Sequence, residues 1–328
     1  MGNLRLKLGM MGSVALIIGI TTLGASIILN GVVGLPLIWT IVFVVPFFFL
    51  QWYYGPRMVE GSMGVEEAPK RQYPELHRIV EDLSRKIGVE KPDVMVSHME
   101  MPNAFAYGNF STGKRVAVTQ GLLDTLEEEE VEAVIGHEMG HIAHNDAEVM
   151  MFISILPAIF MMLGRTLLWS SFLGGRRRNG GALIVVALGA MFFYFLLNLA
   201  ILWFSRLREY YADHFGATNV FEGSRKLQEG LVKIENEMAR LKKKDGETNS
   251  AAAGRTNSSS MGLNPLGSGM KALFIADPDV DTGSEQLSDR EMVDRYREKE
   301  PGISKRLFEL FTTHPELSKR IKALDKYK

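Results

Sequence analysis

The chain has 328 residues, 46% of them hydrophobic, and its 37 basic and 38 acidic side chains give a formal net charge of −1. This balance excludes the strongly basic surface with which proteins bind nucleic acid. The sequence contains no cysteine, which excludes disulfide bonds and thiolate chemistry and fits a reducing compartment.

The first 56 residues are dominated by apolar side chains. No charged residue and no histidine occurs from Gly9 to Pro56, a stretch long enough for two membrane spans of about 20 residues each. Basic residues before this run also fit a cleaved signal peptide, but no small-x-small cleavage site follows and a second span comes at once. Residues 1–56 are therefore predicted to form two transmembrane helices that are not removed.

The next segment, residues 57–148, begins with a helical pattern and continues with strand patterns. Apolar residues at helical spacing predict a helix from Tyr73 to Ile87, which Gly88 ends. Short apolar runs between turn residues predict three strands, at residues 93–97, 104–107 and 115–119. We expect these strands to form one small sheet, whose edge could pair with an extended peptide.

The most informative feature of this segment is the sequence His137-Glu138-Met139-Gly140-His141, which fits the HExxH pattern. Positions i and i+4 lie one turn apart on one helical face, so His137 and His141 can converge on one zinc ion, with Glu138 nearby as a general base. A T-x-x-E capping box at Thr125 and Glu128 predicts the start of the helix. The alternative is a surface helix with solvated histidines, and the apolar helical spacing favours the metal site.

A catalytic zinc site normally has three protein ligands and leaves one position to water. Ala147 stands where one class of HExxH enzyme carries its third histidine, which excludes that class. His144 lies two helical turns, about 10.5 Å, from His137, too far to share the ion. The third ligand is therefore expected from another segment.

Residues 149–205 are predicted to form a transmembrane hairpin, because two further apolar stretches run from Val149 to Phe172 and from Asn179 to Ser205. Arg165 interrupts the first stretch near the far interface, where its side chain can extend to the headgroups. The alternative is a pair of buried helices that do not cross a bilayer. In either case a hairpin leaves and returns on one side, so the segments before and after it can meet.

The hairpin leads into the sequence Ser205-Arg206-Leu207-Arg208-Glu209-Tyr210-Tyr211-Ala212-Asp213, where carboxylates recur at i and i+4 on an expected helix. Glu209 is the candidate third ligand, and Asp213 is the acceptor that orients a ligating imidazole. Taken alone, this segment also fits an ordinary charged helix beside lipid headgroups. The HExxH helix in the same chain favours the ligand interpretation.

Residues 206–328 are predicted to complete the domain that residues 57–148 begin. The stretch 245–270 is rich in Ser, Asn, Ala and Gly, cannot bury a core and is expected to be flexible. Residues 303–311 are expected to form a helix leading to His314. The basic segment from Leu317 to Lys328 is expected to form the last helix.

Taken together, these residues resemble the HtpX-type membrane-bound zinc metalloproteases, relatives of the CAAX-prenyl endoproteases. HEMGH at 137–141 and SRLREYYAD at 205–213 are specific, and Asn103-Ala104-Phe105 and Thr313-His314-Pro315 are weak alone. The four sequences extend over most of the chain. His144 departs from the small polar residue that is usual at its position.

The resemblance implies a mainly α fold with a small β-sheet, an α+β gluzincin-like protease domain, together with about four transmembrane helices. It implies one Zn²⁺ per chain, with Glu209 as a ligand and His314 as the donor that stabilises the oxyanion; Tyr210 and Tyr211 are weaker candidates for that donor. It also implies that Asn103, Ala104 and Phe105 contact substrate at the rim of the cleft. Asn103 fits equally well as a loop residue that caps a strand and has no contact with substrate.

The function implied is an endopeptidase in the bilayer that cuts unfolded or damaged membrane proteins with a zinc-activated water. A prenyl-peptide protease is the nearest alternative, although four spans are few to enclose a lipidated tail. A membrane scaffold or sensor with a structural zinc would need a fourth protein ligand and no Glu138. An ion transporter would place ionisable residues inside its spans, where only Arg165 qualifies.

The balance of Lys and Arg near the span ends predicts the orientation. Most of these residues fall on the side of the HExxH segment, namely Arg5, Lys7, Arg57, Lys70, Arg71, Arg206 and Arg208, against Arg176, Arg177 and Arg178 on the other. We therefore expect a multi-pass protein of the cell membrane whose active site faces the cytoplasm.

Overall fold

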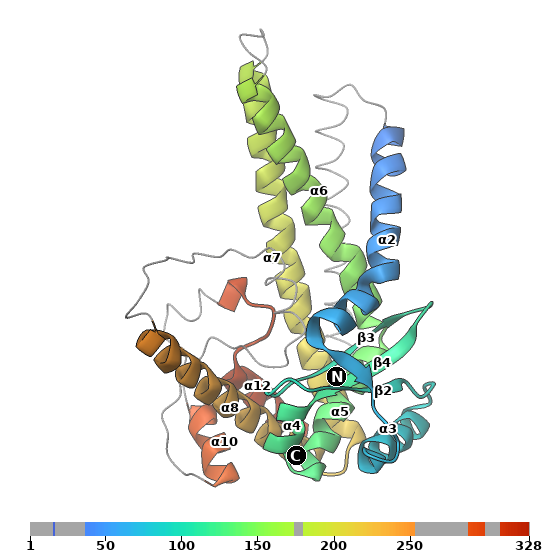
Figure 1. Cartoon of the computed structure of the whole chain (residues 1–328). Helices are drawn as coiled ribbons and strands as arrows, with labels where there is room; N and C mark the ends of the chain where they lie inside the picture. Colours follow the sequence, from blue (N-terminus) through green and yellow to red (C-terminus); the bar gives the residue numbers. More distant parts are fainter. Residues whose placement is uncertain (1–15, 17–36, 174–179, 253–287, 299–308, 328) are drawn as a thin grey trace. The chain divides into compact units, whose positions relative to one another are not determined.

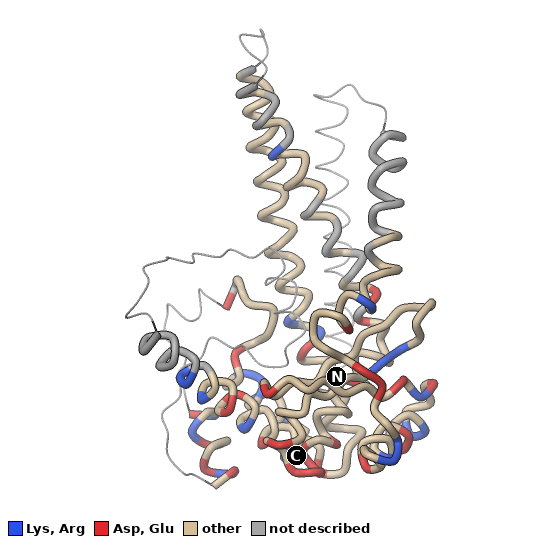
Figure 2. The backbone as a smooth tube through the Cα atoms, viewed as in Figure 1, with Lys and Arg blue, Asp and Glu red and all other residues tan. Residues whose placement is uncertain are grey.

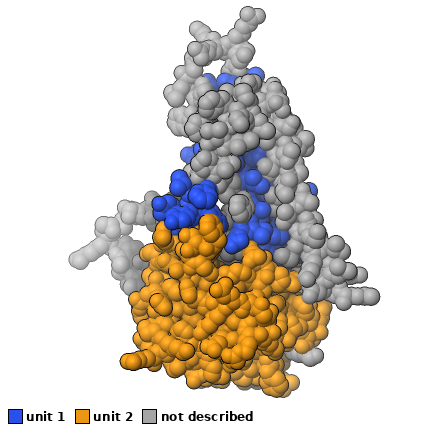
Figure 3. All heavy atoms as spheres, turned by 90° about the vertical axis from the view of Figure 1, so that its right-hand side faces the viewer, with its two compact units in different colours: residues 1–55, 146–208 blue, residues 56–145, 209–328 orange. Residues whose placement is uncertain are grey.

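The computed structural model describes residues 16, 37–173, 180–252, 288–298 and 309–327 (Figure 1). The chain divides into two compact units, which Figure 3 distinguishes by colour. We call residues 1–55 and 146–208 the helical unit, and residues 56–145 and 209–328 the sheet unit. The fold is mostly helical with one small sheet, as the sequence predicts.

The helical unit contains the first part of α2 (Leu37–Met63), α6 (Asp146–Leu173) and most of α7 (Gly180–Asn219). Buried residues of α6 and α7, including Ile153, Phe160 and Leu197, form the core between these two helices. Figure 2 shows few charged residues along these two helices and many in the sheet unit.

Among the described residues, one helix, Gly181–Asn219, is long and apolar enough to cross a membrane, with a mean hydropathy of 2.4 in its most apolar window. The predicted count of about four transmembrane helices is therefore not confirmed. Residues 1–36, where the first predicted span lies, fall outside the described residues apart from Leu16.

The sheet unit is built on four strands in the order β1-β2-β4-β3. The central pair, β2 (Asp93–Ser97) and β4 (Gly113–Thr119), is parallel, whereas β1 (Val65–Glu67) and β3 (Ala104–Asn109) are antiparallel edge strands. The three predicted strands are confirmed. The sequence did not predict β1, because three residues are too short to show an alternating pattern.

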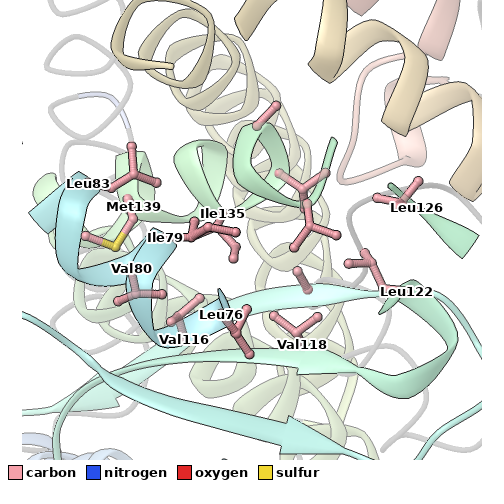
Figure 4. Close-up of a cluster of buried hydrophobic side chains, with 14 of the residues drawn as sticks. Leu76, Ile79, Val80, Leu83, Val116, Val118, Leu122, Leu126, Ile135 and Met139 are labelled. Carbon is pink, nitrogen blue, oxygen red and sulfur yellow. The ribbon is translucent and has the colours of Figure 1, made fainter. Parts of the chain in front are cut away.

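The two faces of the sheet have separate cores because successive side chains of a strand point to opposite faces. On one face, α3 (Pro74–Ile87) and α5 (Glu128–Ala143) pack on the sheet through the residues drawn in Figure 4. On the other face the end of α2 packs through Met63 against Phe105 and Tyr107. The predicted helix at residues 73–87 is confirmed: Gly88 ends it in the left-handed conformation, at φ 71°, which favours glycine.

Further helices are α4 (Gln120–Thr125), α8 (Gly223–Ala252), α10 (Asp289–Glu298) and α12 (Leu317–Leu324), with 3₁₀ turns η2 (Glu309–Phe311) and η3 (Asp325–Tyr327). Of these helices, α4 and α8 pack against α5, and α10 and α12 pack against α8. Buried leucines of α8 reach the core shared with α5. The last predicted helix is confirmed as α12, although it ends at Leu324 and continues as η3.

The outcomes for two expected segments of this region are mixed. The helix α8 continues to Ala252, so residues 245–252 are helical, and the flexibility of the stretch 245–270 stays a prediction. Of the helix expected at 303–311, Glu309–Phe311 is a 3₁₀ turn. Residues 253–287 and 299–308 lie outside the described residues.

Candidate metal centre

The helix α5 begins two residues later than the sequence predicts. Its N-cap is Glu127, whose backbone N–H donates to the Glu130 carboxylate over 2.9 Å while the Glu127 side chain caps the N–H of Glu130. Thr125 instead belongs to α4, where its hydroxyl donates to the carbonyl of Gly121. The predicted Thr125–Glu128 capping box is therefore wrong, and Glu127 and Glu130 form the box at the same spacing.

Glycines let α5 approach the end of α7 closely. A Cβ atom added to Gly140 would lie 3.2 Å from Cα of Ala212, and one added to Gly216 would lie 3.1 Å from the backbone nitrogen of His137. Larger side chains at these positions would push the backbones apart. The contact places the histidines of α5 opposite the carboxylates of α7.

The HExxH side chains converge as the sequence predicts. One potential ligand atom from each of His137, Glu138 and His141 lies within 4.8 Å of the others. His137 and Glu138 are buried, and the His141 side chain is 11% exposed. These donors have the composition that zinc prefers.

Glu209 lies beside both histidines. Its Oε2 is 3.7 Å from Nε2 of His137, and its Oε1 is 3.6 Å from Nε2 of His141. Ligand atoms about 2.1 Å from an ion at tetrahedral angles lie about 3.4 Å from one another. The observed distances are therefore close to the spacing that one zinc ion requires.

Glu138 is held by the sheet. Its Oε2 accepts a hydrogen bond of 2.9 Å from the backbone N–H of Ala106 in β3. Burial raises the pKa of Glu138 above its usual value, and the neighbouring histidines oppose this effect only in part. A raised pKa suits a carboxylate that must take up a proton and release it again.

Asp213 lies one turn beyond Glu209 on α7, with Oδ1 3.0 Å from Nδ1 of His137. Asp213 also contacts Arg320 of α12, a residue that the sequence did not predict to be in the centre. Its Nε donates to Oδ2 over 2.9 Å and its Nη2 to Oδ1 over 2.6 Å. The only signal in the sequence is a basic residue six positions after His314, which is not specific.

The structure also locates the remaining histidines of interest. Nδ1 of His314 lies 3.0 Å from Oε2 of Glu209, so the segment before α12 reaches the centre. His144 is the C-cap of α5, with Nδ1 2.7 Å from the carbonyl of Gly140 and its ring packed edge-on against Tyr211. Neither of these contacts of His144 involves His137 or Glu209.

The predicted substrate contacts, Asn103, Ala104 and Phe105, are buried in the structure. The backbone N–H of Asn103 donates to the Thr119 hydroxyl, and Phe105 packs in the core between the sheet and α2. Their side chains therefore do not form an exposed rim. The strand that begins with them, β3, nevertheless lies at the edge of the sheet next to Glu138.

Comparisons with known proteins show the family of the chain. The family described as Peptidase family M48 matches residues 70–328. The chain is 33% identical to a "Protease HtpX homolog" of Thermoplasma acidophilum, over 99% of this chain and 98% of that protein. It is 34% identical to a protein of the same name from Aeropyrum pernix, over 84% of this chain and 82% of that protein. A crystal structure of S. mikatae Ste24p aligns with a TM-score of 0.49 and 16% identity, covering 99% of this chain and 67% of the other.

Proposed function

The chain belongs to peptidase family M48, and from this premise we propose that it is a membrane-bound, zinc-dependent endopeptidase that cuts misfolded or damaged membrane proteins. The observation that supports the proposal most is that carboxylate oxygens of Glu209 lie 3.7 and 3.6 Å from Nε2 of His137 and His141, about the spacing of tetrahedral ligands, while Glu138 lies within 4.8 Å of both histidines. The matched region, residues 70–328, includes all of these side chains.

In this proposal His137, His141 and Glu209 hold one Zn²⁺, and the donor set fits that ion. When bound, the ion would polarise the substrate carbonyl and lower the pKa of a water molecule beside it. Glu138 removes the proton from the attacking water and later returns it to the leaving amine. Burial raises the pKa of this carboxyl group and so favours the first of these transfers, the uptake of the proton.

We assign His314 to the stabilisation of the oxyanion that forms on the substrate. Its Nδ1 faces Glu209, and its Nε2 is buried without a hydrogen-bond partner among the described residues. A protonated Nε2 could therefore donate to a substrate oxygen. Oδ1 of Asp213 lies 3.0 Å from Nδ1 of His137, and this contact leaves Nε2 of that ring for the ion.

We propose that the substrate binds as an extended strand along the outer edge of β3. This edge has no neighbouring strand among the described residues, and main-chain pairing lets a protease accept many different side chains. Because Asn103, Ala104 and Phe105 are buried, the backbone of their strand rather than their side chains would provide these contacts. Broad acceptance of sequences suits an enzyme that removes damaged proteins.

Metal removal tests the proposal directly. We expect the purified full chain to contain one zinc ion and to cleave a generic unfolded protein. A strong chelator should abolish cleavage, and added zinc should restore it, because the ion supplies the activation of water. A chain that contains no zinc, or that keeps its full rate after the ion has been removed, would contradict the proposal.

We further propose that residues 1–56 and 149–205 form the membrane spans and that the sheet unit faces the cytoplasm. The charge balance near the span ends supports this orientation. Since the chain has no cysteine, a single cysteine at exposed Lys70 provides a clean probe. We expect an impermeant thiol reagent to label Lys70→Cys only after the cells are opened. If the reagent labels Lys70→Cys in intact cells, the sheet unit faces the outside of the cell and the proposed orientation is wrong.

A further inference from the structure

The candidate for a new role is Arg320, a completely buried arginine of α12 whose side chain is 2% exposed. Its guanidinium binds both oxygens of Asp213, and its Nη1 lies 3.7 Å from Oε2 of Glu209. A permanent charge that cannot be neutralised is costly to bury unless it is paired. The pair with Asp213 satisfies that requirement.

We propose that Arg320 is a positioning residue of the metal centre, because its two hydrogen bonds fix Asp213 with Oδ1 against Nδ1 of His137. A planar guanidinium that binds a carboxylate through two parallel hydrogen bonds fixes its orientation more narrowly than one contact would. Oδ1 of Asp213 lies 2.6 Å from Nη2 of Arg320 and 3.0 Å from His137. The same oxygen therefore connects the arginine to the imidazole.

The charges of the site support the same role. Three buried carboxyl groups, Glu138, Glu209 and Asp213, lie in the centre. A divalent ion and one permanent cation together balance three negative charges. Arg320 provides that cation without occupying a ligand position, because a guanidinium has no lone pair to offer a metal.

The helix that carries Arg320 is itself held firmly. The Ser224 hydroxyl of α8 donates to the carbonyl of Leu324 over 2.7 Å, and the amide of Gln228 donates to the carbonyl of Ile321 over 2.8 Å. These bonds attach the C-terminal end of α12 to α8, and the carbonyl of Ile321 also accepts from the backbone N–H of Asp325. The guanidinium is therefore fixed by its own helix as well as by Asp213.

This inference rests on the proposed zinc site, and its test measures metal binding rather than proteolysis. We would determine the zinc affinity of the purified full chain by competition with a chelator and record the visible spectrum of the cobalt-loaded protein, which reports coordination geometry. We expect Arg320→Met to lower zinc affinity about 10–100-fold, as is typical when the partner of a ligand is lost, and to alter the cobalt spectrum. Arg320→Lys keeps the positive charge but cannot form the bidentate contact with Asp213. Its zinc affinity should lie between those of the wild type and Arg320→Met.

Arg297 of α10 provides a matched control. It also binds both oxygens of an aspartate, Asp325 in the same C-terminal segment, over 3.0 and 3.1 Å. Arg297→Met should leave zinc affinity and the cobalt spectrum unchanged, even if it lowers the thermal midpoint. If Arg320→Met has no larger effect on these two measurements than Arg297→Met, the role of Arg320 is refuted.

A double-mutant comparison covers the case in which Arg320→Met does not fold because Asp213 is left unpaired. Asp213→Asn removes that charge, so the double variant should fold. If Arg320 acts through Asp213, adding Arg320→Met to Asp213→Asn should lower zinc affinity little further, whereas a full additional loss would overturn the proposal. Wild-type protein that binds no zinc would instead contradict the proposed function itself.

Discussion

Replacing Glu138 by glutamine should leave zinc bound and reduce cleavage of an unfolded protein by about 10²–10⁴-fold, the range typical of general acid–base groups. Glutamine keeps the shape of the side chain and can still accept the hydrogen bond from the N–H of Ala106. It cannot take up the proton of the attacking water. The measurement compares zinc content and the initial rate of cleavage for the purified wild type and variant.

Glu132→Gln is the control for this experiment. Glu132 belongs to the same helix, its side chain is 35% exposed, and it pairs with Lys226 of α8. Because it does not contact the metal centre, the control should keep the wild-type rate. Unchanged cleavage by Glu138→Gln would show that Glu138 is not the base, and loss of its zinc would contradict the assignment of metal binding to His137, His141 and Glu209 alone.

Replacing Glu209 by alanine should lower zinc affinity by at least about 100-fold, because a lost ligand costs more than the 10–100-fold that follows from losing the partner of a ligand. The variant removes the carboxylate that lies 3.6 and 3.7 Å from the two imidazoles. The remaining histidines would leave two positions for water or solutes. The measurement is zinc affinity by chelator competition, with zinc content after dialysis as a second readout.

The variant His144→Ala tests whether His144, rather than Glu209, is the third zinc ligand. His144 contacts Gly140 and the ring of Tyr211, so its removal should reduce packing but leave zinc affinity unchanged. Glu209→Gln provides a milder variant if the alanine variant is unstable. Zinc loss in His144→Ala together with zinc retention in both Glu209 variants would make His144 the third ligand.

Several parts of the fold could be predicted from short stretches of sequence. The helix from Pro74 and the three longer strands appear within a few residues of their predicted bounds, because apolar spacing and a terminal glycine are local signals. The predicted start of α5 is wrong because Thr125 lies in α4, and Glu127, which is not a preferred N-cap residue, caps α5 instead. The count of about four spans was an extrapolation from apolar length, and one helix among the described residues meets that criterion.

The candidate metal-binding side chains could be predicted from local sequence. Two imidazoles and a glutamate at HExxH spacing must lie on one face when the segment is helical, and Glu209 and Asp213 at i and i+4 share a face for the same reason. The tertiary structure decided which distant side chains meet these groups. Arg320 is 107 positions from Asp213, and periodicity carries no information across such a separation.

Burial was likewise decided by the tertiary structure. Asn103, Ala104 and Phe105 lie inside the sheet unit because both faces of the sheet are covered, by α3 and α5 on one side and by the end of α2 on the other. Glycines at the contact of α5 with α7 set how closely the histidines approach the carboxylates. Local spacing determines which residues share a helical face. Which faces meet depends on packing between segments that are distant in sequence, because contacts form between residues that are close in space.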